Sequence, residues 1–177
     1  MSDRFWPKLP LNESIGLISM RIVKATVNDY KAVLPLFQGL DDLHTNLESE
    51  RFKPYSGPAR TKNAYDFYIL GEDRALFLAL IDGEAIGFIN LWIVNIEEKR
   101  IHIGRSYAHM DNIYVTPNYR RKGVAEKLLA QAKDWCKEVG VDKIELQVYA
   151  VNADAIAWYD AHGFDVFLKR FQLDIEQ

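Results

Sequence analysis

The stretch His109–Ala125, with the sequence HMDNIYVTPNYRRKGVA, decides how this chain is expected to fold. Its first seven residues mix aromatic and β-branched side chains, and this predicts a strand that ends at Val115. The Thr-Pro-Asn sequence that follows predicts a turn. Apolar residues then recur at helical spacing from Val124 onward, which predicts a helix ending near Val139.

Three consecutive cations and a glycine stand between the turn and the helix: Arg120, Arg121, Lys122 and Gly123. The free amides of a first helical turn and the helix dipole attract anions, and a glycine lets the backbone approach a ligand closely. The arrangement favours a phosphate site, and the alternative is a helix that simply begins after a turn. Neither G-x-x-x-x-G-K-[ST] nor G-x-G-x-x-G is present, which excludes two familiar phosphate loops.

The composition of the 177-residue chain is that of one globular domain with a sizeable core. Apolar residues make up 49% and charged residues 27% of it. The net charge of −3 argues against a general nucleic-acid binder, so the basic cluster is local and suits one small anion. Cys136 is the only cysteine, which rules out a disulfide within the chain and favours a buried structural thiol.

Membrane and secretion signals are missing from the sequence. No apolar run approaches the roughly 18 residues of a membrane-spanning helix. The N-terminus lacks the layout of a signal peptide, so a cytoplasmic protein is expected. Residues 1–18 show no sustained period and predict an N-terminal extension to a domain of residues 19–177.

The remaining segments predict an α/β fold on a mixed sheet. Pro35 is expected to kink or restart the first helix, and Gly39 is expected to end it. An Asp82-Gly83 turn predicts a hairpin, and Gly87 in its second strand predicts a bulge or a close backbone approach. Further strands are expected at 20–26, 75–81, 84–94, 143–150, 164–167 and 169–173, and helices after 26–28, near 43–47, at 63–70 and after 152.

Two motifs in this order carry a family resemblance. Arg120–Ala125 matches R/Q-x-x-G-x-G/A directly after a strand. Some thirty residues later, Asn152-x-x-Ala155-x-x-x-Tyr159-x-x-x-Gly163-Phe164 matches a second signature at the expected distance. From Met20 to Leu173 the chain therefore resembles the GNAT superfamily of N-acetyltransferases.

The resemblance implies a GNAT fold, in which helices flank a mixed, mostly antiparallel central sheet that splays between its fourth and fifth strands. It also implies acetyl-CoA as co-substrate and no metal. The pantetheine arm would bond to main chain in the gap, and the pyrophosphate would sit on the amides of the glycine loop. Asn152 would lie near the pantetheine or serve as a helix cap. The implied coenzyme contacts are Ile113, Tyr114, Val115, Arg120, Arg121, Lys122, Gly123, Val124, Ala125 and Asn152.

The same resemblance suggests the catalytic groups. Tyr159 is expected to protonate the departing thiolate, because a phenol with a reference pKa near 10 remains a donor at neutral pH; the alternative is a packing residue. Asp111 and His109, two apart on one strand face, are alternative bases, and either is otherwise a polar residue at the cleft rim. His44, His102 and His162 lack metal-ligand spacing and are interpreted as surface or packing residues.

These observations predict direct transfer of acetyl from acetyl-CoA to a primary amine of a small molecule. The alternatives are a protein lysine or N-terminal acetyltransferase and a non-catalytic acyl-CoA-binding module. No nucleic-acid or membrane partner is expected. A homodimer is one option, with Phe5 and Trp6 docking on a partner subunit or on the domain itself.

Overall fold

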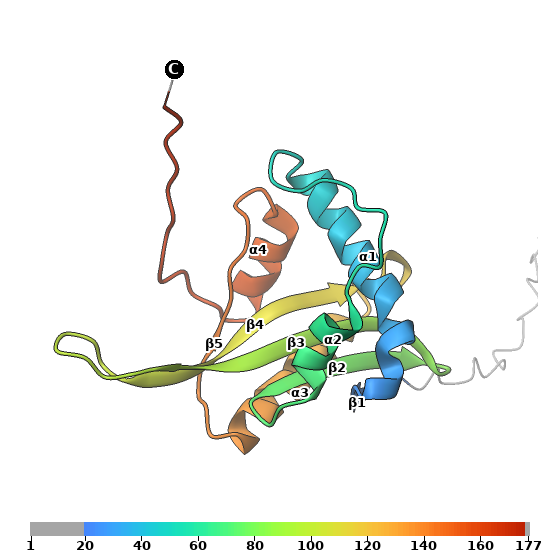
Figure 1. Ribbon diagram of the computed structural model, residues 1–177, viewed down its shortest axis with the longest axis horizontal. Helices are drawn as coiled ribbons and strands as arrows, with labels where there is room; N and C mark the ends of the chain where they lie inside the picture. Colours follow the sequence, from blue (N-terminus) through green and yellow to red (C-terminus); the bar gives the residue numbers. More distant parts are fainter. Residues whose placement is uncertain (1–19, 176–177) are drawn as a thin grey trace, which may run out of the picture.

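One five-stranded sheet organises residues 20–175, which are the residues that the computed structural model describes (Figure 1). The strands lie in the order β1-β2-β3-β4-β5, and all neighbours are antiparallel except β4 and β5. This confirms the predicted mixed α/β class. The elements are β1 (Arg21–Lys24), η1 (Val27–Asp29), α1 (Tyr30–Leu47), α2 (Lys62–Ile69), β2 (Arg74–Ile81), β3 (Glu84–Ile96), β4 (Arg105–Val115), η2 (Pro117–Tyr119), α3 (Val124–Glu138), β5 (Ile144–Glu145) and α4 (Ala153–Ala161).

The sheet opens between β4 and β5. These strands pair only at Ala108↔Ile144 and His109↔Glu145. β4 then continues to Val115 against β3, whereas the chain after Glu145 leaves the sheet. One edge of the second half of β4 therefore has no neighbouring strand among the described residues.

Helices cover both faces of the sheet. α1 and α2 lie on one face and α3 on the other (Figure 1). Alternation along β2 fills both cores: Leu76 and Leu78 pack towards α1 and α2, and Ala75, Phe77 and Ala79 towards α3. Cys136 is buried in the α3 core, as expected, and this burial raises the pKa of its thiol to about 11.

The β2–β3 hairpin forms as predicted. Asp82 and Gly83 both have positive φ (50° and 84°), which matches the right-handed twist of the two strands. The register shifts by one residue next to Gly87, where a Cβ would lie 2.8 Å from the carbonyl oxygen of Tyr114. Both parts of the Gly87 prediction, a bulge and a close approach, are therefore confirmed.

The predictions that the first helix restarts at Pro35 and ends at Gly39 are wrong. α1 runs for 18 residues through Pro35 and Gly39 and absorbs the second short helix predicted near 43–47. Pro35 is on the exposed side, where water can bond the carbonyl that the proline leaves without a donor. Gly39 is where α1 approaches β4, because a Cβ there would lie 2.3 Å from the hydroxyl of Tyr114.

The strands predicted for the last part of the chain are also corrected. The strand expected at 143–150 is paired only at Ile144–Glu145, and residues 164–167 and 169–173 form no strand pair. No described strand lies on the outer side of β5 to complete these ladders. The predicted extension at 1–18, with Phe5 and Trp6, lies outside the described residues. None of the helices described within 20–175 is long and apolar enough to cross a membrane.

Candidate active site

The glycine loop begins where β4 ends. Arg121 and Gly123 both have positive φ, 56° and 77°, so the backbone curls twice before α3 starts. Successive amides in such a curl, followed by the first amides of a helix, form a concave anion site. A Cβ built on Gly123 would meet no atom within 4 Å, so its φ alone demands glycine there. The position next to Gly123 is therefore open.

The three cations of the loop have different surroundings. The Nε of Arg120 donates to the carbonyl oxygen of Val115 at 3.0 Å, and its guanidinium lies 5.6 Å from the ring of Tyr114. Arg120 therefore ties the loop to the end of β4. The ammonium of Lys122 lies 5.4 Å from the ring of Tyr119. Arg121 and Lys122 are exposed beside the amide curl.

The implied coenzyme residues fall along one line of backbone. Ile113, Tyr114 and Val115 lie in the part of β4 beyond its pairing with β5, and the loop to Ala125 follows directly. Asn152 caps α4, because its Oδ1 accepts from the amide of Ala155 at 3.2 Å. The capping alternative is therefore what the structure shows, and a contact with pantetheine stays a prediction.

Tyr159 lies on α4, at the side where the sheet opens. Its ring packs edge-on against Trp158 and Phe164, with centroids 5.5 Å away in both cases, and against the α3 core. Burial raises the pKa of its hydroxyl to about 12. The phenol therefore stays protonated at neutral pH and can donate a proton.

Contacts with α3 hold α4 in position. His162 stacks on Trp158 at 4.2 Å, and its Nε2 lies 3.8 Å from a carboxylate oxygen of Glu126 on α3. The indole Nε1 of Trp158 donates to the same oxygen at 3.5 Å. His162 is thus a packing residue, as interpreted from the sequence.

Asp111 occupies a bulge in β4. Asn90 pairs with Asn112 and Leu91 with Met110, which leaves Asp111 as the extra residue. Its Oδ2 accepts hydrogen bonds from the hydroxyl of Tyr68 at 2.7 Å and from the side-chain amides of Asn112 at 2.7 Å and Asn90 at 3.3 Å. All three donors hold one oxygen, so Oδ1 remains for a ligand in the part of the chain that the structure describes.

A cluster of aromatic side chains lies beside this carboxylate. The ring of His109 lies 4.5 Å from Trp92, which pairs with it across β3 and β4. Trp92 in turn lies 6.2 Å from Tyr68 and 5.8 Å from Phe67 of α2. Asp111 and His109 therefore share the α2 side of the sheet, as predicted from their spacing. The structure thus places both candidate bases beside the same cluster of aromatic side chains.

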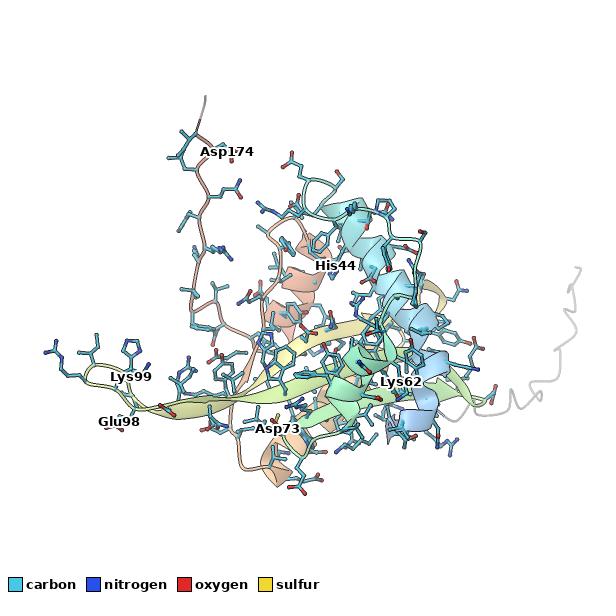
Figure 2. The ribbon with its side chains drawn as sticks, in the orientation of Figure 1. His44, Lys62, Asp73, Glu98, Lys99 and Asp174 are labelled. Carbon is cyan, nitrogen blue, oxygen red and sulfur yellow. The ribbon has the colours of Figure 1, made fainter. Side chains whose placement is uncertain are left out.

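His44 contributes to the same region from α1 (Figure 2). Its ring stacks on Phe52 at 5.2 Å, and Phe52 meets Tyr149 edge-on at 5.3 Å. Burial lowers the pKa of His44, Arg60 lowers it further, and the charges of Asp41 and Asp111 partly oppose these effects. His44 is therefore a packing residue that is neutral at neutral pH.

Sequence reasoning missed the residues that hold Asp111. Asn90 is fully buried in an otherwise apolar strand, and its Oδ1 has no partner in the described structure. A polar residue inside the run Ala85–Ile93 was the available signal. Tyr68 carried only a weak signal, as one of several aromatic residues on α2. Burial and the hydrogen bond to Asp111 raise its pKa, so it remains a donor.

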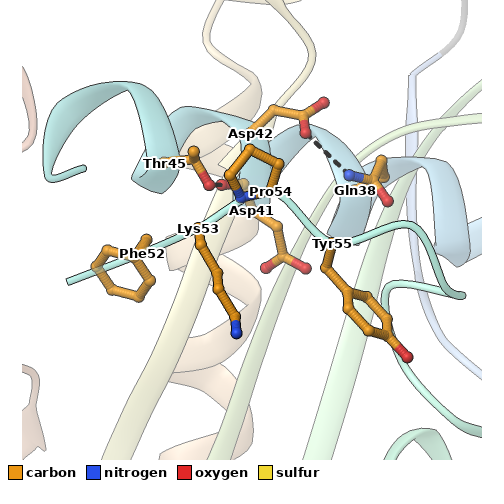
Figure 3. Close-up of a pocket in the computed structure, with 8 residues that line it drawn as sticks. All are labelled: Gln38, Asp41, Asp42, Thr45, Phe52, Lys53, Pro54 and Tyr55. Carbon is orange, nitrogen blue, oxygen red and sulfur yellow. Dashed lines mark hydrogen bonds between the residues drawn. The ribbon is translucent and has the colours of Figure 1, made fainter. Parts of the chain in front are cut away.

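A pocket of about 100 Å³ lies between α1 and the loop that follows it (Figure 3). Ligand pockets usually occupy about 300 Å³ or more, so this one is too small for a substrate. It shows that the loop packs directly on α1. The lining residues are Gln38, Asp41, Asp42, Thr45, Phe52, Lys53, Pro54 and Tyr55. No group of three or more His, Cys, Asp or Glu within residues 20–175 is arranged to hold a metal.

Comparison with known proteins identifies the family. Residues 40–164 match the model of the acetyltransferase (GNAT) family. An uncharacterised N-acetyltransferase of Bacillus subtilis, YhfO, is 26% identical over 148 residues, which are 82% of this chain and 90% of that protein. Streptothricin acetyltransferase A of the same organism is 27% identical over 135 residues, or 75% and 70% of the two chains.

A solved structure shows the same fold. A mutant of the BH1408 protein of Bacillus halodurans superposes with a TM-score of 0.82 at 20% identity, over 88% of this chain and 99% of that one. Together with the family model, which spans most of the domain and both sequence motifs, this match confirms the resemblance read from the sequence. The chain belongs to the GNAT family of acetyltransferases and is an enzyme of that family.

Proposed function

We propose that this enzyme transfers an acetyl group from acetyl-CoA directly to a primary amine of a small molecule. The observation that carries the small-molecule part is the contact of Phe52 with Tyr149. This contact joins the loop after α1 to the segment after β5, so it limits the space in which an acceptor could bind. Arg60 anchors this loop to α1 through two bonds to Asp41, at 2.8 and 3.1 Å. The relative named streptothricin acetyltransferase A supports the same class of acceptor.

The residues present fit acetyl-CoA. The curl at Arg121 and Gly123 offers amides to a pyrophosphate. The edge of β4 from Ile113 to Val115, which no described strand pairs, offers main-chain groups to an extended amide-bearing arm. Side-chain charge contributes through Arg121 and Lys122. The co-substrate supplies a thioester whose acetyl group is activated for transfer.

Asp111 is proposed to hold the acceptor amine through its Oδ1. A carboxylate fixed by three donors is suited to binding a cationic amine, because its orientation is set before the ligand arrives. Asp111 or His109 first takes one proton from the bound ammonium, and the neutral nitrogen then attacks the carbonyl carbon. The carbon–sulfur bond then breaks, and Tyr159 gives its proton to the departing thiolate. The second proton that the nitrogen loses as the amide forms restores the proton that Tyr159 gives up.

The proposal is tested by following thiol release from acetyl-CoA with a panel of amines. Amino acids, polyamines and aminoglycosides are compared with lysine-containing peptides and peptides with free N-termini. We expect release with at least one small amine, and its loss in Asp111→Asn with acetyl-CoA binding retained. Release with peptides alone would make this a protein acetyltransferase. Binding of acetyl-CoA without release from any amine would support the non-catalytic module.

Cytoplasmic location and the lack of nucleic-acid or membrane partners stay predictions from the sequence.

A further inference from the structure

Four aromatic side chains form a continuous cluster on the α2 side of the sheet, and this aromatic cluster begins at Asp111. Its members are Phe67, Tyr68, Trp92 and His109, and their neighbouring ring centroids lie between 4.5 and 6.2 Å apart. Tyr68 also donates its hydroxyl to Oδ2 of Asp111 at 2.7 Å, so the carboxylate and the rings belong to one surface. Phe67 is 41% exposed and the other three residues are half-buried, so a ligand can still cover part of the cluster.

The aromatic cluster and the proposed acetyl-CoA site lie on opposite sides of Asp111 along β4. The glycine loop follows the end of β4 at Val115, whereas His109 precedes Asp111 and pairs with Trp92 on β3. Residues two apart on a strand are separated by roughly 7 Å, a distance that a short alkyl chain with a terminal ring can span. An amine held by Asp111 would therefore have acetyl-CoA on one side and the aromatic cluster on the other.

The charges around Asp111 suit a ligand with a single ammonium group. In the part of the chain that the structure describes, Asp111 takes part in no ion pair. Asp41, the other carboxylate within electrostatic range of His44, accepts from Arg60 through both oxygens, at 2.8 and 3.1 Å. Arg60 is also within electrostatic range of Tyr68. A second ammonium group of a ligand would therefore meet a guanidinium and aromatic rings in place of a free carboxylate.

We infer that the acceptor is an aromatic monoamine, in which a short alkyl chain joins one primary amine to one ring, as in phenethylamine, an assignment that rests on the proposed function. The ammonium group donates to Oδ1 of Asp111. The ring packs on Tyr68 and Trp92, where aromatic pairs are stabilised beyond the burial of their area. Transfer forms the bond from nitrogen to the acetyl carbon and breaks the carbon–sulfur bond, and the products are an N-substituted acetamide, the thiol of coenzyme A and one proton.

The first test compares thiol release from acetyl-CoA across five amines. Phenethylamine is matched by cyclohexylethylamine, which keeps the alkyl chain and a six-carbon ring but has no π system. n-Propylamine lacks the ring, and spermidine and kanamycin carry several ammonium groups. We expect kcat/KM for phenethylamine to exceed that for cyclohexylethylamine about two- to tenfold, which is the range of an aromatic pair. It should exceed the values for the other three at least about thirtyfold, because only phenethylamine combines ring burial with a single charge.

The outcomes separate the acceptor class from the proposed function. A kcat/KM for n-propylamine, spermidine or kanamycin that equals or exceeds that for phenethylamine would overturn the aromatic monoamine and leave the proposed function intact. Equal values for phenethylamine and cyclohexylethylamine would show that any apolar group is accepted, which also overturns the inference. Release from no amine, in this set or in the wider panel, would overturn the proposed function itself.

A pair of substitutions at Trp92 tests the surface. Trp92→Leu removes the ring that contacts both Tyr68 and His109, whereas Trp92→Phe keeps an aromatic face. We expect Trp92→Leu to raise KM for phenethylamine about tenfold or more and to change kcat/KM for n-propylamine less than about threefold. Trp92→Phe should restore most of the lost affinity. Circular dichroism and the thermal shift with acetyl-CoA check that both variants fold. An equal loss with both amines in Trp92→Leu would make Trp92 a structural residue and overturn the inference.

Discussion

The proposed coenzyme site and the proposed acceptor site are built from different parts of the chain. At the proposed coenzyme site, Arg121 and Gly123 adopt positive φ, and main-chain amides would form the receptor. At the proposed acceptor site, side chains from α2, β3 and β4 converge on one oxygen of Asp111. The first site depends on the conformation of a short segment, and the second on groups up to 43 residues apart in the sequence.

This difference predicts two patterns of mutational sensitivity. An amide receptor should tolerate changes of side chain, except where a residue must adopt positive φ. A network of side chains should lose function with each donor removed, because the remaining polar groups lose their partner. The following substitutions separate these patterns, from the largest expected effect to the smallest.

Tyr159→Phe should have the largest effect. Phenylalanine keeps the ring contacts with Trp158 and Phe164, so folding and acetyl-CoA affinity should change little. The rate constant for transfer should fall about 10²- to 10⁴-fold, the usual scale for the loss of a general acid. Steady-state kinetics on the acceptor found above measure it, with Tyr107→Phe, at the base of the hairpin, as control. Turnover near that of the wild type would remove Tyr159 from the mechanism.

Gly123→Val tests the amide receptor. A β-branched residue at φ 77° is strained, so the loop should open and the thermal stabilisation by acetyl-CoA should disappear. Gly140→Val is the matched control, because Gly140 has the same φ of 77° at the other end of α3 and an equally open environment. Both variants should have a lower melting temperature than the wild type, but only Gly123→Val should lose the thermal stabilisation by acetyl-CoA. A shift that persists in Gly123→Val would place the pyrophosphate elsewhere.

Tyr68→Phe tests the side-chain network at Asp111. It removes one donor to a carboxylate, a bond worth about 1.5–3 kcal/mol, so kcat/KM for the acceptor should fall about tenfold or more with acetyl-CoA affinity unchanged. Tyr65→Phe, one turn earlier on α2, removes a bond to the carbonyl of Thr26 instead. We expect it to lower the melting temperature without this kinetic effect. If kcat/KM changed equally in the two variants, the hydrogen bonds to Asp111 would have no role in acceptor binding.

The same contrast explains what could be predicted from the sequence. The glycine loop, the Asp82-Gly83 turn and the Asn152 cap each depend on neighbouring residues, so local patterns were sufficient. The helix break at Pro35 and Gly39 was predicted wrongly, since packing of α1 on Tyr114 outweighs local helix propensity. The clustering of Tyr68, Asn90 and Asp111 depends on the register of the sheet and a bulge, which one sequence does not specify.

The unpaired strands at the end of the chain illustrate a further limit. Residues 143–150 and 169–173 have the alternation of strands, yet only Ile144–Glu145 pairs in the structure. Ladder formation also requires a partner strand, and among the described residues no such strand lies on the outer side of β5. Sequence patterns therefore predict which segments favour an extended conformation, whereas pairing depends on a neighbouring strand that the pattern does not specify.

The smallest expected effect concerns the pH dependence of stability, and it comes from His44 on α1. The pKa of His44 in the folded protein is lowered from its ordinary value of 6.5, so the unfolded chain binds the proton first as pH falls. Stability is therefore fully present above 6.5 and is lost as pH falls towards the folded value. Asp41 and Asp111 limit the loss, and Arg60 increases it.

Between about pH 7.5 and 5.5, the melting temperature of His44→Gln should fall less than that of the wild type. The melting temperature of His102→Gln, at the exposed hairpin tip, should fall as much as that of the wild type. The measurement is thermal unfolding of the three proteins across this range, and an equal loss in His44→Gln and the wild type would show that this histidine does not couple folding to pH.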